Sequence, residues 1–330
     1  MQKKLDIISI GEILIDFVGK EHSTALKDVT EFRRAAGGGP ANVAVGAARL
    51  GMKAGFVGKV GSDAFGNHLA QVLNDNGVNT DGLIIDPVAN TTLVFVALNQ
   101  KGVPDFSFFR NGAADTLLRI DELPVKLLQK TKILHFSSVS LTTEPSRSAC
   151  LKAVEIARNA GAMISFDPNL RLPLWPDAES AKAAIRGAVE LADVLKMNDE
   201  EYLFLTGQQV DENANSEGFF VNGHLKLLAV TRGERGAILF NNYETICFQG
   251  LPVQVVDTTG AGDAFMAGML SVLSELPASA LIDRFCMEQI GIWAGATAAL
   301  ACQRSGGIPS LPDREGVVDL ITSMKPDYQK

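Results

Sequence analysis

The chain has 330 residues, of which 46% are apolar and 21% charged, and it carries a formal net charge of −8. This composition is typical of a globular protein with a sizeable core, and the acidic balance argues against nucleic-acid binding, because the sequence gathers no basic face to neutralise phosphates. Four widely spaced cysteines and four histidines without ligand spacing predict neither a disulfide framework nor a zinc site.

The beginning of the chain shows no targeting signal. The apolar run at 7–10 is far too short for the core of a signal peptide. No segment approaches the roughly 20 uninterrupted apolar residues that a membrane helix needs. We therefore expect a cytoplasmic protein without a membrane partner.

The first third of the chain predicts strands and helices in an irregular order. Residues 6–16 are rich in β-branched side chains and predict a strand that ends on the carboxylate of Asp16. The elements expected next are a helix at 41–50, a strand at 54–57, a helix at 64–76 and a hairpin formed by 91–99 and 106–110. The segments 12–35 and 91–112 do not fit a regular alternation, so we interpret them as a small β insertion and a candidate lid.

From residue 131 onward the pattern is regular. The expected strands lie at 133–136, 163–166, 194–197 and 227–230, the expected helices at 145–160, 178–191, 264–276 and 279–302, and a hairpin at 237–247. Strands that alternate with helices imply a parallel sheet covered on both faces. The fold class is therefore predicted to be α/β, as one three-layer α/β/α domain over residues 1–330.

The strongest chemical signal is the run DTTGAGD at 257–263. Gly260, Ala261 and Gly262 open a helix whose first N–H groups lack intrahelical partners, and small side chains let an anionic oxygen approach them. Asp263 follows directly, where its carboxylate could take the proton of an attacking hydroxyl. Phosphoryl transfer requires this combination, because negative charge spreads over the transferred oxygens.

A simpler interpretation makes this run a turn in which Asp263 only caps a helix. That interpretation leaves Asp257, six residues upstream, and Gly268, five residues downstream, without explanation. We therefore favour a catalytic base.

Two motifs together resemble those of the ribokinase-like, or PfkB-type, carbohydrate kinases. The first is GGGPAN at 37–42, followed by Gly51 and Gly61, and the second is the run that starts at Asp257 and continues to Gly268. Their order and separation also match, and the resemblance covers nearly the whole chain. It implies a ribokinase-like domain with a β-sheet lid that transfers phosphate from ATP, with Mg²⁺, to a sugar hydroxyl.

The resemblance also implies roles for particular positions. Asp263 resembles the general base, and the backbone of Gly260, Ala261 and Gly262 resembles the anion hole. The positions that resemble sugar-hydroxyl partners are Asp16, Gly38, Gly39 and Asn42. Carboxylate and carboxamide groups supply the acceptors and donors that vicinal hydroxyls need.

Further positions resemble the nucleotide and magnesium sites of the family. The run NDEE at 198–201 resembles an element whose last residue, Glu201, helps to organise Mg²⁺ through water, although a helix N-cap with an acidic first turn explains it equally well locally. The run TRGERG at 231–236 resembles the nucleotide loop. The implied ATP-binding residues are Asn198, Thr231, Gly233, Gly236, Ala261 and Gly262.

The run ACQRSGGIPS at 301–310 resembles a loop that holds a monovalent cation in potassium-activated members of the family. K⁺ is therefore a possible cofactor. The implied cation ligands are Asp257, Thr259, Ala301, Arg304, Gly306 and Ser310. One departure lies nearby: Gly295 stands where some relatives place an Asn or His against the adenine ring.

Two segments bear on the choice of sugar. FFRNGAAD at 108–115 and FDPNLRLPLW at 166–175 resemble the fructokinase and 2-keto-3-deoxygluconate kinase branch. Arg110 and Arg171 could each contact a ligand oxygen, but surface ion pairs explain both arginines as well by position alone. We predict a fructokinase, with 2-keto-3-deoxygluconate kinase or another sugar or nucleoside kinase as alternatives.

Two other classes of protein agree less well with the sequence. A catalytically silent sugar or nucleotide sensor is expected to have lost its base, whereas Asp263 is present. A dinucleotide-binding dehydrogenase is disfavoured because 37–42 is not GxGxxG after a first strand. We also expect a possible homodimer through the lid, because the apolar segment 93–97 could present an exposed strand edge that seeks a partner.

Overall fold

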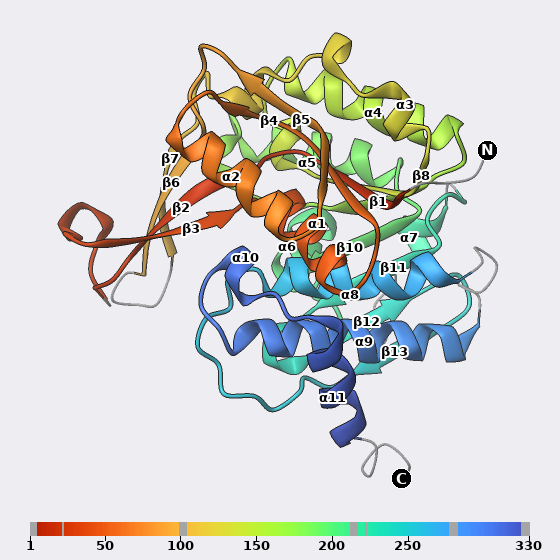
Figure 1. The fold of residues 1–330 in the computed structure, drawn as a ribbon. Helices are drawn as coiled ribbons and strands as arrows, with labels where there is room; N and C mark the ends of the chain where they lie inside the picture. Colours follow the sequence, from red (N-terminus) through yellow and green to blue (C-terminus); the bar gives the residue numbers. More distant parts are fainter. Residues whose placement is uncertain are drawn as a thin grey trace.

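The computed structural model describes residues 5–21, 23–98, 104–211, 217–221, 223–276 and 283–324. A nine-stranded sheet with the order β13-β12-β11-β10-β9-β8-β1-β4-β5 forms its centre (Figure 1). These strands are β1 (Leu5–Ile10), β4 (Ala54–Gly61), β5 (Asn79–Asp86), β8 (Thr131–Ser137), β9 (Met163–Asp167), β10 (Val194–Asn198), β11 (Leu227–Thr231), β12 (Ala237–Phe240) and β13 (Thr245–Phe248).

The pairing of these strands confirms the predicted α/β class. Every neighbouring pair from β5 to β11 is parallel, and only β12 and β13 pair in the antiparallel sense. The strand β5 was not predicted, since its sequence NTDGLIID mixes polar and apolar residues without a clear period. The strand predicted at 54–57 continues to Gly61 as β4.

Helices cover both faces of the large sheet, as the alternation predicted. Along β1, Ile8 and Ile10 pack on one face, whereas Ile7 packs on the other, because successive side chains of a strand point in opposite directions. The first face is covered by α4 (Ser146–Asn159), α5 (Ala178–Val189) and α6 (Asp199–Thr206), and the second by α1 (Gly39–Arg49), α8 (Ala261–Glu275) and α9 (Arg284–Cys302).

The remaining helices are short or peripheral. They are α2 (Ala64–Asp75), α3 (Val125–Leu128), α7 (Glu217–Phe220), α10 (Gly307–Ser310) and α11 (Arg314–Met324). Short 3₁₀ turns lie at Leu26–Asp28, Ala114–Leu117, Ile120–Glu122, Val139–Leu141, Leu172–Leu174 and Gly233–Arg235. Of the helices predicted near the C-terminus, α8 begins three residues earlier than expected, and α9 begins at Arg284 after the cap Asp283; residues 279–282 lie outside the described part.

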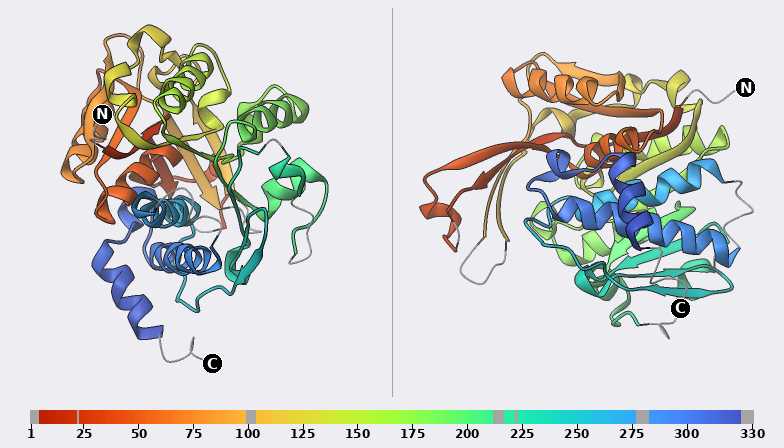
Figure 2. Two further views of the ribbon diagram at one scale, coloured as in Figure 1. Left: turned by 90° about the vertical axis from the view of Figure 1, so that its right-hand side faces the viewer. Right: turned by 60° about the horizontal axis from the view of Figure 1, so that its bottom comes forward.

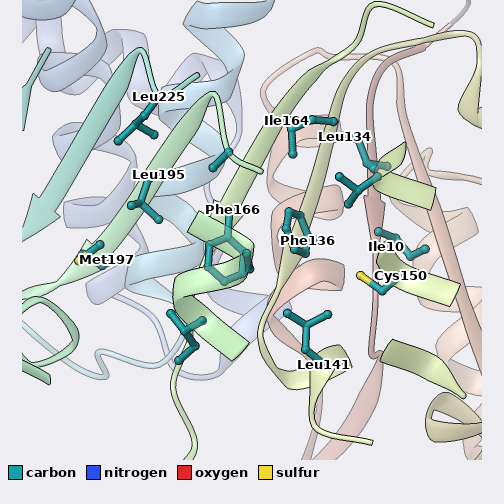
Figure 3. Packing of buried hydrophobic residues seen from close by; sticks show 14 of the residues in the cluster. Ile10, Leu134, Phe136, Leu141, Cys150, Ile164, Phe166, Leu195, Met197 and Leu225 are labelled. Carbon is teal, nitrogen blue, oxygen red and sulfur yellow. The ribbon is translucent and has the colours of Figure 1, made fainter. Parts of the chain in front are cut away.

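The core under α4 and α5 is built from the middle of the parallel strands (Figure 3). Phe136 of β8 and Phe166 of β9 are both fully buried, and their ring centroids lie 4.7 Å apart. Burying each such side chain contributes about 1.5–3 kcal/mol. This packing holds the carboxyl ends of β8 and β9 in one register.

Within the part of the chain that the structure describes, α9 is the one helix long and apolar enough to suit a membrane span. It packs along α8, and Met287 and Ile290 lie in the core shared with β11 and β12. A core helix meets the same criteria of length and composition, so this finding is weak evidence for a membrane.

A second, four-stranded sheet projects from the main body (Figure 2). Its order is β3 (Phe32–Gly37), β2 (Leu14–Gly19), β6 (Leu93–Leu98) and β7 (Pro104–Phe109). These strands come from the segments that the sequence analysis interpreted as a β insertion. Residues 99–103, within the predicted hairpin, and His22 lie outside the described part.

The strand predicted at 6–16 is wrong in one respect: it is two strands in two different sheets. The chain leaves the large sheet at Gly11, which has φ +150°. A Cβ atom built there would lie 2.6 Å from both the Pro40 ring and the Ser140 hydroxyl, so a side chain does not fit. The break therefore depends on neighbours distant in the sequence.

The prediction that segment 93–97 presents an exposed strand edge for a dimer is also wrong. β6 is hydrogen-bonded to β2 on one side and β7 on the other, so segment 93–97 presents no free strand edge. The edges of this sheet are β3 and β7, and Phe109 of β7 is 63% exposed.

A buried polar cluster joins the chain segments that cross between the two sheets. Arg110, directly after β7, donates from Nε to Asp115 Oδ2 at 2.7 Å, and Thr92, directly before β6, donates to Asp115 Oδ1 at 2.5 Å. The other guanidinium nitrogens of Arg110 donate to Thr142 Oγ1 at 2.7 Å and to the Val139 carbonyl at 3.2 Å. Arg110 is only 5% exposed, so the interpretation of this arginine as a surface ion-pair partner is wrong.

Replacing Arg110 by methionine is expected to destabilise the fold, because it leaves the Asp115 carboxylate buried without its counter-charge. Breaking a buried ion pair in this way costs about 3–5 kcal/mol of unfolding free energy. Urea denaturation of Arg110→Met measures the loss.

The matched control is Arg119→Met, whose guanidinium pairs with Asp121 while both side chains are largely exposed. Solvent screens such a pair, so this control should denature close to the unchanged protein. Equal denaturation midpoints for the two variants would contradict a structural role for Arg110.

Candidate active site

The candidate site lies where several parallel strands end and α8 begins. Asp167 closes β9, Asn198 closes β10 and Thr231 closes β11, while Asp263 stands in the first turn of α8. In open α/β sheets, ligands bind outside the carboxyl ends of the strands. The topology therefore gathers side chains that are far apart in the sequence.

One hydrogen bond joins the two glycine-rich motifs. Asn42 Nδ2, in the first turn of α1, donates to Asp263 Oδ2 at 2.7 Å across 221 positions of sequence. Asn42 Oδ1 is buried and has no hydrogen-bond partner among the described residues. The same amide thus orients the Asp263 carboxylate and keeps one acceptor available for a ligand donor.

The surroundings of Asp263 favour a proton acceptor. The pKa of Asp263 is raised to about 6, chiefly because surrounding protein atoms desolvate its carboxylate and also because Asp167 is negatively charged. The Asn42 hydrogen bond and the charges of Lys196 and Arg171 oppose that rise. A carboxylate with such a pKa is unprotonated at neutral pH and is still basic enough to accept a proton.

The start of α8 has the geometry of an anion site. Gly260 precedes the helix with φ +80°, a left-handed conformation that side chains disfavour. The first regular bond of the helix runs from Ala264 N–H to the Gly260 carbonyl at 2.8 Å, and Ala261 N–H donates to the Thr258 carbonyl at 3.1 Å. Helix geometry leaves Gly262 N–H without a carbonyl four residues back, at the positive end of the helix dipole.

The predicted sugar partners converge on the same place. A Cβ atom at Gly37 would lie 2.1 Å from Asp16 Oδ2, and one at Gly39 would lie 3.5 Å from Asp263 Oδ1 and 2.4 Å from Asn169 Nδ2. Gly38 has φ +105°. Only glycine lets these backbones approach so closely, so the structure brings the 37–39 segment beside both carboxylates.

Asp16, in β2 of the second sheet, adds a further carboxylate to the site around Asp263. Its pKa is raised to about 7, mainly by burial and also by the negative charge of Asp263, whereas the charge of Arg171 opposes the rise. Arg171 donates to the Leu170 carbonyl at 3.0 Å, and its guanidinium lies 5.8 Å from the Phe106 ring centroid of β7. Arg171 thus stands between the large sheet and the second one, whereas Arg110 is held in the cluster described above.

Asn198 and Glu201 form a capping box at the start of α6. Asn198 Oδ1 accepts from Glu201 N–H at 2.7 Å, and Glu201 Oε2 accepts from Asn198 N–H at 2.8 Å. Glu201 Oε1 accepts from Leu170 N–H at 2.7 Å. These contacts show the helix-capping role that the sequence left open. Burial and the charge of Asp167 raise the pKa of Glu201.

The predicted nucleotide loop follows the neighbouring strand. Thr231 pairs with Asn198 in the β10–β11 register. Gly233 and Gly236 have φ of +58° and +85°, and a Cβ at Gly236 would lie 2.0 Å from the Phe248 carbonyl oxygen. A Cβ at Gly295 would meet no atom within 4 Å in the part of the chain that the structure describes, so the face of α9 is open there to these residues.

The predicted cation ligands lie close to one another. Asp257 accepts from Thr259 N–H at 2.9 Å through Oδ1, and from Gly306 N–H at 2.8 Å through Oδ2. The backbone N–H of Asp257 itself donates to the Cys302 carbonyl at 3.2 Å. Ser310 is fully buried and donates to the Gly307 carbonyl. Asp257 therefore joins the segment before α8 to the loop after α9.

Sequence reasoning missed two charged residues of this site. Lys196 of β10 donates to Asp167 Oδ2 at 2.8 Å, and both side chains are almost completely buried. The available signal was a lysine inside the otherwise apolar strand LKM at 195–197, since a buried charge requires a partner.

Comparison with known proteins places this geometry in a family. The model of the pfkB family of carbohydrate kinases matches residues 4–314. Probable fructokinase-6, chloroplastic, of Arabidopsis thaliana is 46% identical over 315 residues, which cover 96% of this chain and 82% of that protein.

Solved structures agree. A fructokinase from Xylella fastidiosa with bound ATP is 36% identical, with a TM-score of 0.87 and coverage of 97% of this chain and 98% of the other. A double-mutant fructokinase from Vibrio cholerae O395, bound to fructose, ADP and a potassium ion, is 32% identical, with a TM-score of 0.84 and coverage of 97% and 99%. The chain therefore belongs to the pfkB family of carbohydrate kinases.

Proposed function

We propose that this protein is an ATP-dependent fructokinase that transfers phosphate to a primary hydroxyl of fructose, with Asp263 as the general base. The observation that carries the proposal is the Asp263 carboxylate, which stands at the start of α8 with a raised pKa and a hydrogen bond from Asn42. The fructokinases of Arabidopsis and Xylella named above support the choice of sugar.

The reaction uses the groups at the start of α8. Asp263 takes the proton of the sugar hydroxyl, whose oxygen attacks the γ-phosphorus of ATP. The bond from that phosphorus to the β,γ-bridging oxygen breaks, and ADP leaves. Among the backbone N–H groups at 260–262, that of Gly262 would stabilise the negative charge on the transferred oxygens, whereas that of Ala261 donates to the Thr258 carbonyl in this structure.

Sugar binding involves residues from both sheets. Asp16 and Asn42 would accept and donate hydrogen bonds to vicinal hydroxyls, with the backbone of Gly38 and Gly39 against the sugar ring. Because Arg171 contacts Phe106 of β7, closure of the second sheet would also change the position of this guanidinium. We propose that this sheet, from segments 12–35 and 91–112 of one 1–330 domain, acts as a lid that excludes water.

Arg110 has a different part in the proposal. Three of its N–H donors are used inside the buried cluster, at Asp115, Thr142 and Val139. A guanidinium has five donors, so Arg110 retains capacity for a sugar oxygen if the second sheet closes. Its main role is then to hold in place the chain segments that cross between the two sheets.

ATP would lie along the ends of β10 and β11, with Asn198, Thr231, Gly233 and Gly236 on one side and the start of α8 on the other. A bound magnesium ion supplies positive charge that neutralises the phosphates. Both Glu201 oxygens accept backbone N–H groups, and among the described residues no group of three His, Cys, Asp or Glu could hold a metal ion. A magnesium ion held by phosphates and water, with Glu201 behind the water, fits these facts.

A potassium ion would fit the loop that joins Asp257 to 301–310. The candidate ligands are Asp257, Ser310 and the carbonyls of Thr259, Ala301, Arg304 and Gly306. Asp257 binds the loop directly through Gly306, so an ion there would also fix the peptides before α8. The Vibrio structure named above contains potassium, which supports testing this ion.

Two further expectations remain predictions. A homodimer would use the exposed face or edge of β7, where Phe106 and Phe109 are accessible, rather than β6. The cytoplasmic location rests on the sequence alone, and the Arabidopsis relative is described as chloroplastic.

The sugar is tested by measuring ADP release with fructose, 2-keto-3-deoxygluconate, ribose and adenosine, each with and without potassium. We expect the highest kcat/KM with fructose and stimulation by potassium. If ribose or adenosine is the best acceptor, the fructokinase assignment is wrong, although the protein would still be a kinase.

Asp263→Asn is expected to lower kcat by about 10²–10⁴-fold, the usual contribution of a general base, while sugar binding is retained. The amide keeps the shape and the contact with Asn42 but cannot accept the proton. The matched control is Asp283→Asn, which changes an exposed carboxylate that caps α9. Asparagine caps equally well, so this variant should keep full turnover; a fully active Asp263→Asn protein would exclude the base assignment.

The pH profile gives a second test. Asp263 works only when unprotonated, so its contribution to kcat/KM should fall tenfold per pH unit below its pKa of about 6. Because the Asn42 hydrogen bond lowers that pKa, Asn42→Leu should move the acidic limb to higher pH. An acidic limb that stays in place in Asn42→Leu would argue that another group controls the profile.

A further inference from the structure

Lys196 is a buried cation beside the start of α8. Its residue is 5% exposed and lies in the middle of β10, where its backbone pairs with Ala229 of β11. A Cβ atom at Gly262 would lie 2.8 Å from Lys196 Nζ. The ammonium therefore occupies the space that a side chain at position 262 would take. The absence of a side chain at Gly262 thus allows the Lys196 cation to come close, as well as an anionic ligand.

Asp167 fixes the position of this ammonium. Lys196 Nζ donates to Asp167 Oδ2 at 2.8 Å, and Asp167 is 2% exposed. Asp167 ends β9, whose register with β8 and β10 is set by the core around Phe136 and Phe166. An ammonium has three donors, and this bond uses one of them.

The charges of the site leave a role for such a cation. Four carboxylates gather here, namely Asp16, Asp167, Glu201 and Asp263. The negative charge of Asp167 contributes to the raised pKa of Glu201 and of Asp263, and that of Asp263 contributes to the raised pKa of Asp16. Burial lowers the pKa of Lys196, but the negative charges of Asp167, Glu201 and Asp263 outweigh that effect and raise it above its ordinary value, so the lysine is charged. A transferred phosphoryl group would also meet this negative potential, which the positive charges of Lys196 and Arg171 partly offset.

A buried ion pair can also be purely structural. In that case the pair could be replaced as a unit by neutral groups with little loss of stability or function. Lys59 is an example elsewhere in the chain: it is 4% exposed and pairs with Asp86 and Glu122 at 2.9 and 2.8 Å, with no catalytic group among these partners. What distinguishes Lys196 is the contact with Gly262 in the anion site.

We propose that Lys196 is a further catalytic residue, whose ammonium contacts the transferred phosphoryl group beside Gly262, and that Asp167 is the positioning residue that holds it there. This proposal rests on the proposed phosphoryl transfer from ATP. It does not depend on which sugar receives the phosphate.

The first test measures binding without any sugar. Isothermal titration of Lys196→Met with magnesium and the β,γ-imido analogue of ATP should show binding at least tenfold weaker than in the unchanged protein. ADP, which lacks the γ-phosphate, should bind within twofold of normal. Lys59→Met, the matched control, should bind both nucleotides normally. Equal effects on the analogue and on ADP in Lys196→Met, or no effect on either, would overturn the contact with the transferred group.

The second test separates catalysis from stability. Lys196→Met and Asp167→Asn should each lower the melting temperature, because each leaves one buried polar partner unpaired. The double variant should recover most of the melting temperature, but its kcat should remain about 10²–10³-fold low, the usual effect of losing one donor to a developing anion. Lys196→Arg should recover part of kcat by keeping the charge. Recovery of kcat together with the melting temperature in the double variant would make the pair structural and overturn the proposal.

The binding and kinetic experiments also distinguish a failure of the fructokinase proposal from a failure of the Lys196 proposal. If the unchanged protein prefers a sugar other than fructose, the fructokinase proposal fails, and the kinetic arm is run with the preferred sugar. If no sugar is phosphorylated, the binding arm still decides whether Lys196 recognises the γ-phosphate.

Discussion

The site depends on the close contact between α1 and α8, because this contact allows Asn42 to reach Asp263. A Cβ at Gly46 would lie 2.8 Å from the Ala267 methyl group, so small residues let the two helices approach. Gly268 does the same on the other side of α8, where a Cβ would lie 2.7 Å from Thr297 Oγ1 of α9. The small residues that continue the second motif therefore serve packing, and packing aligns the base.

The second constraint is electrostatic. The strand ends and the start of α8 bring several carboxylates into a partly desolvated space, and burial is the largest cause of the raised pKa values of Asp16 and Asp263. Such a group of like charges is costly for stability and is found where a function requires it. Lys196 and Arg171 offset part of that charge, and the triphosphate with its metal ion would complete the balance.

The two sheets are joined by polar contacts as well as by the chain itself. Arg110, Asp115 and Thr92 connect the segments that enter and leave the second sheet, while Arg171 reaches it through Phe106. A buried, hydrogen-bonded network of this kind fixes orientation more strictly than apolar contacts do, because an unpaired member is expensive. The second sheet is therefore anchored at its base, while its far end projects from the body (Figure 2).

The amino-acid sequence by itself determined the α/β alternation, the two glycine-rich motifs and the identity of the candidate base, because these signals are local: a period along a strand or helix, or small residues before a helix. It could not show that residues 6–16 divide between two sheets, that Arg110 is buried against Asp115, or that Lys196 and Asp167 stand beside Gly262. Only the tertiary structure decided these points. Each is a contact between segments distant in the chain, and the burial and pKa of a charged group depend on which distant segment packs against it.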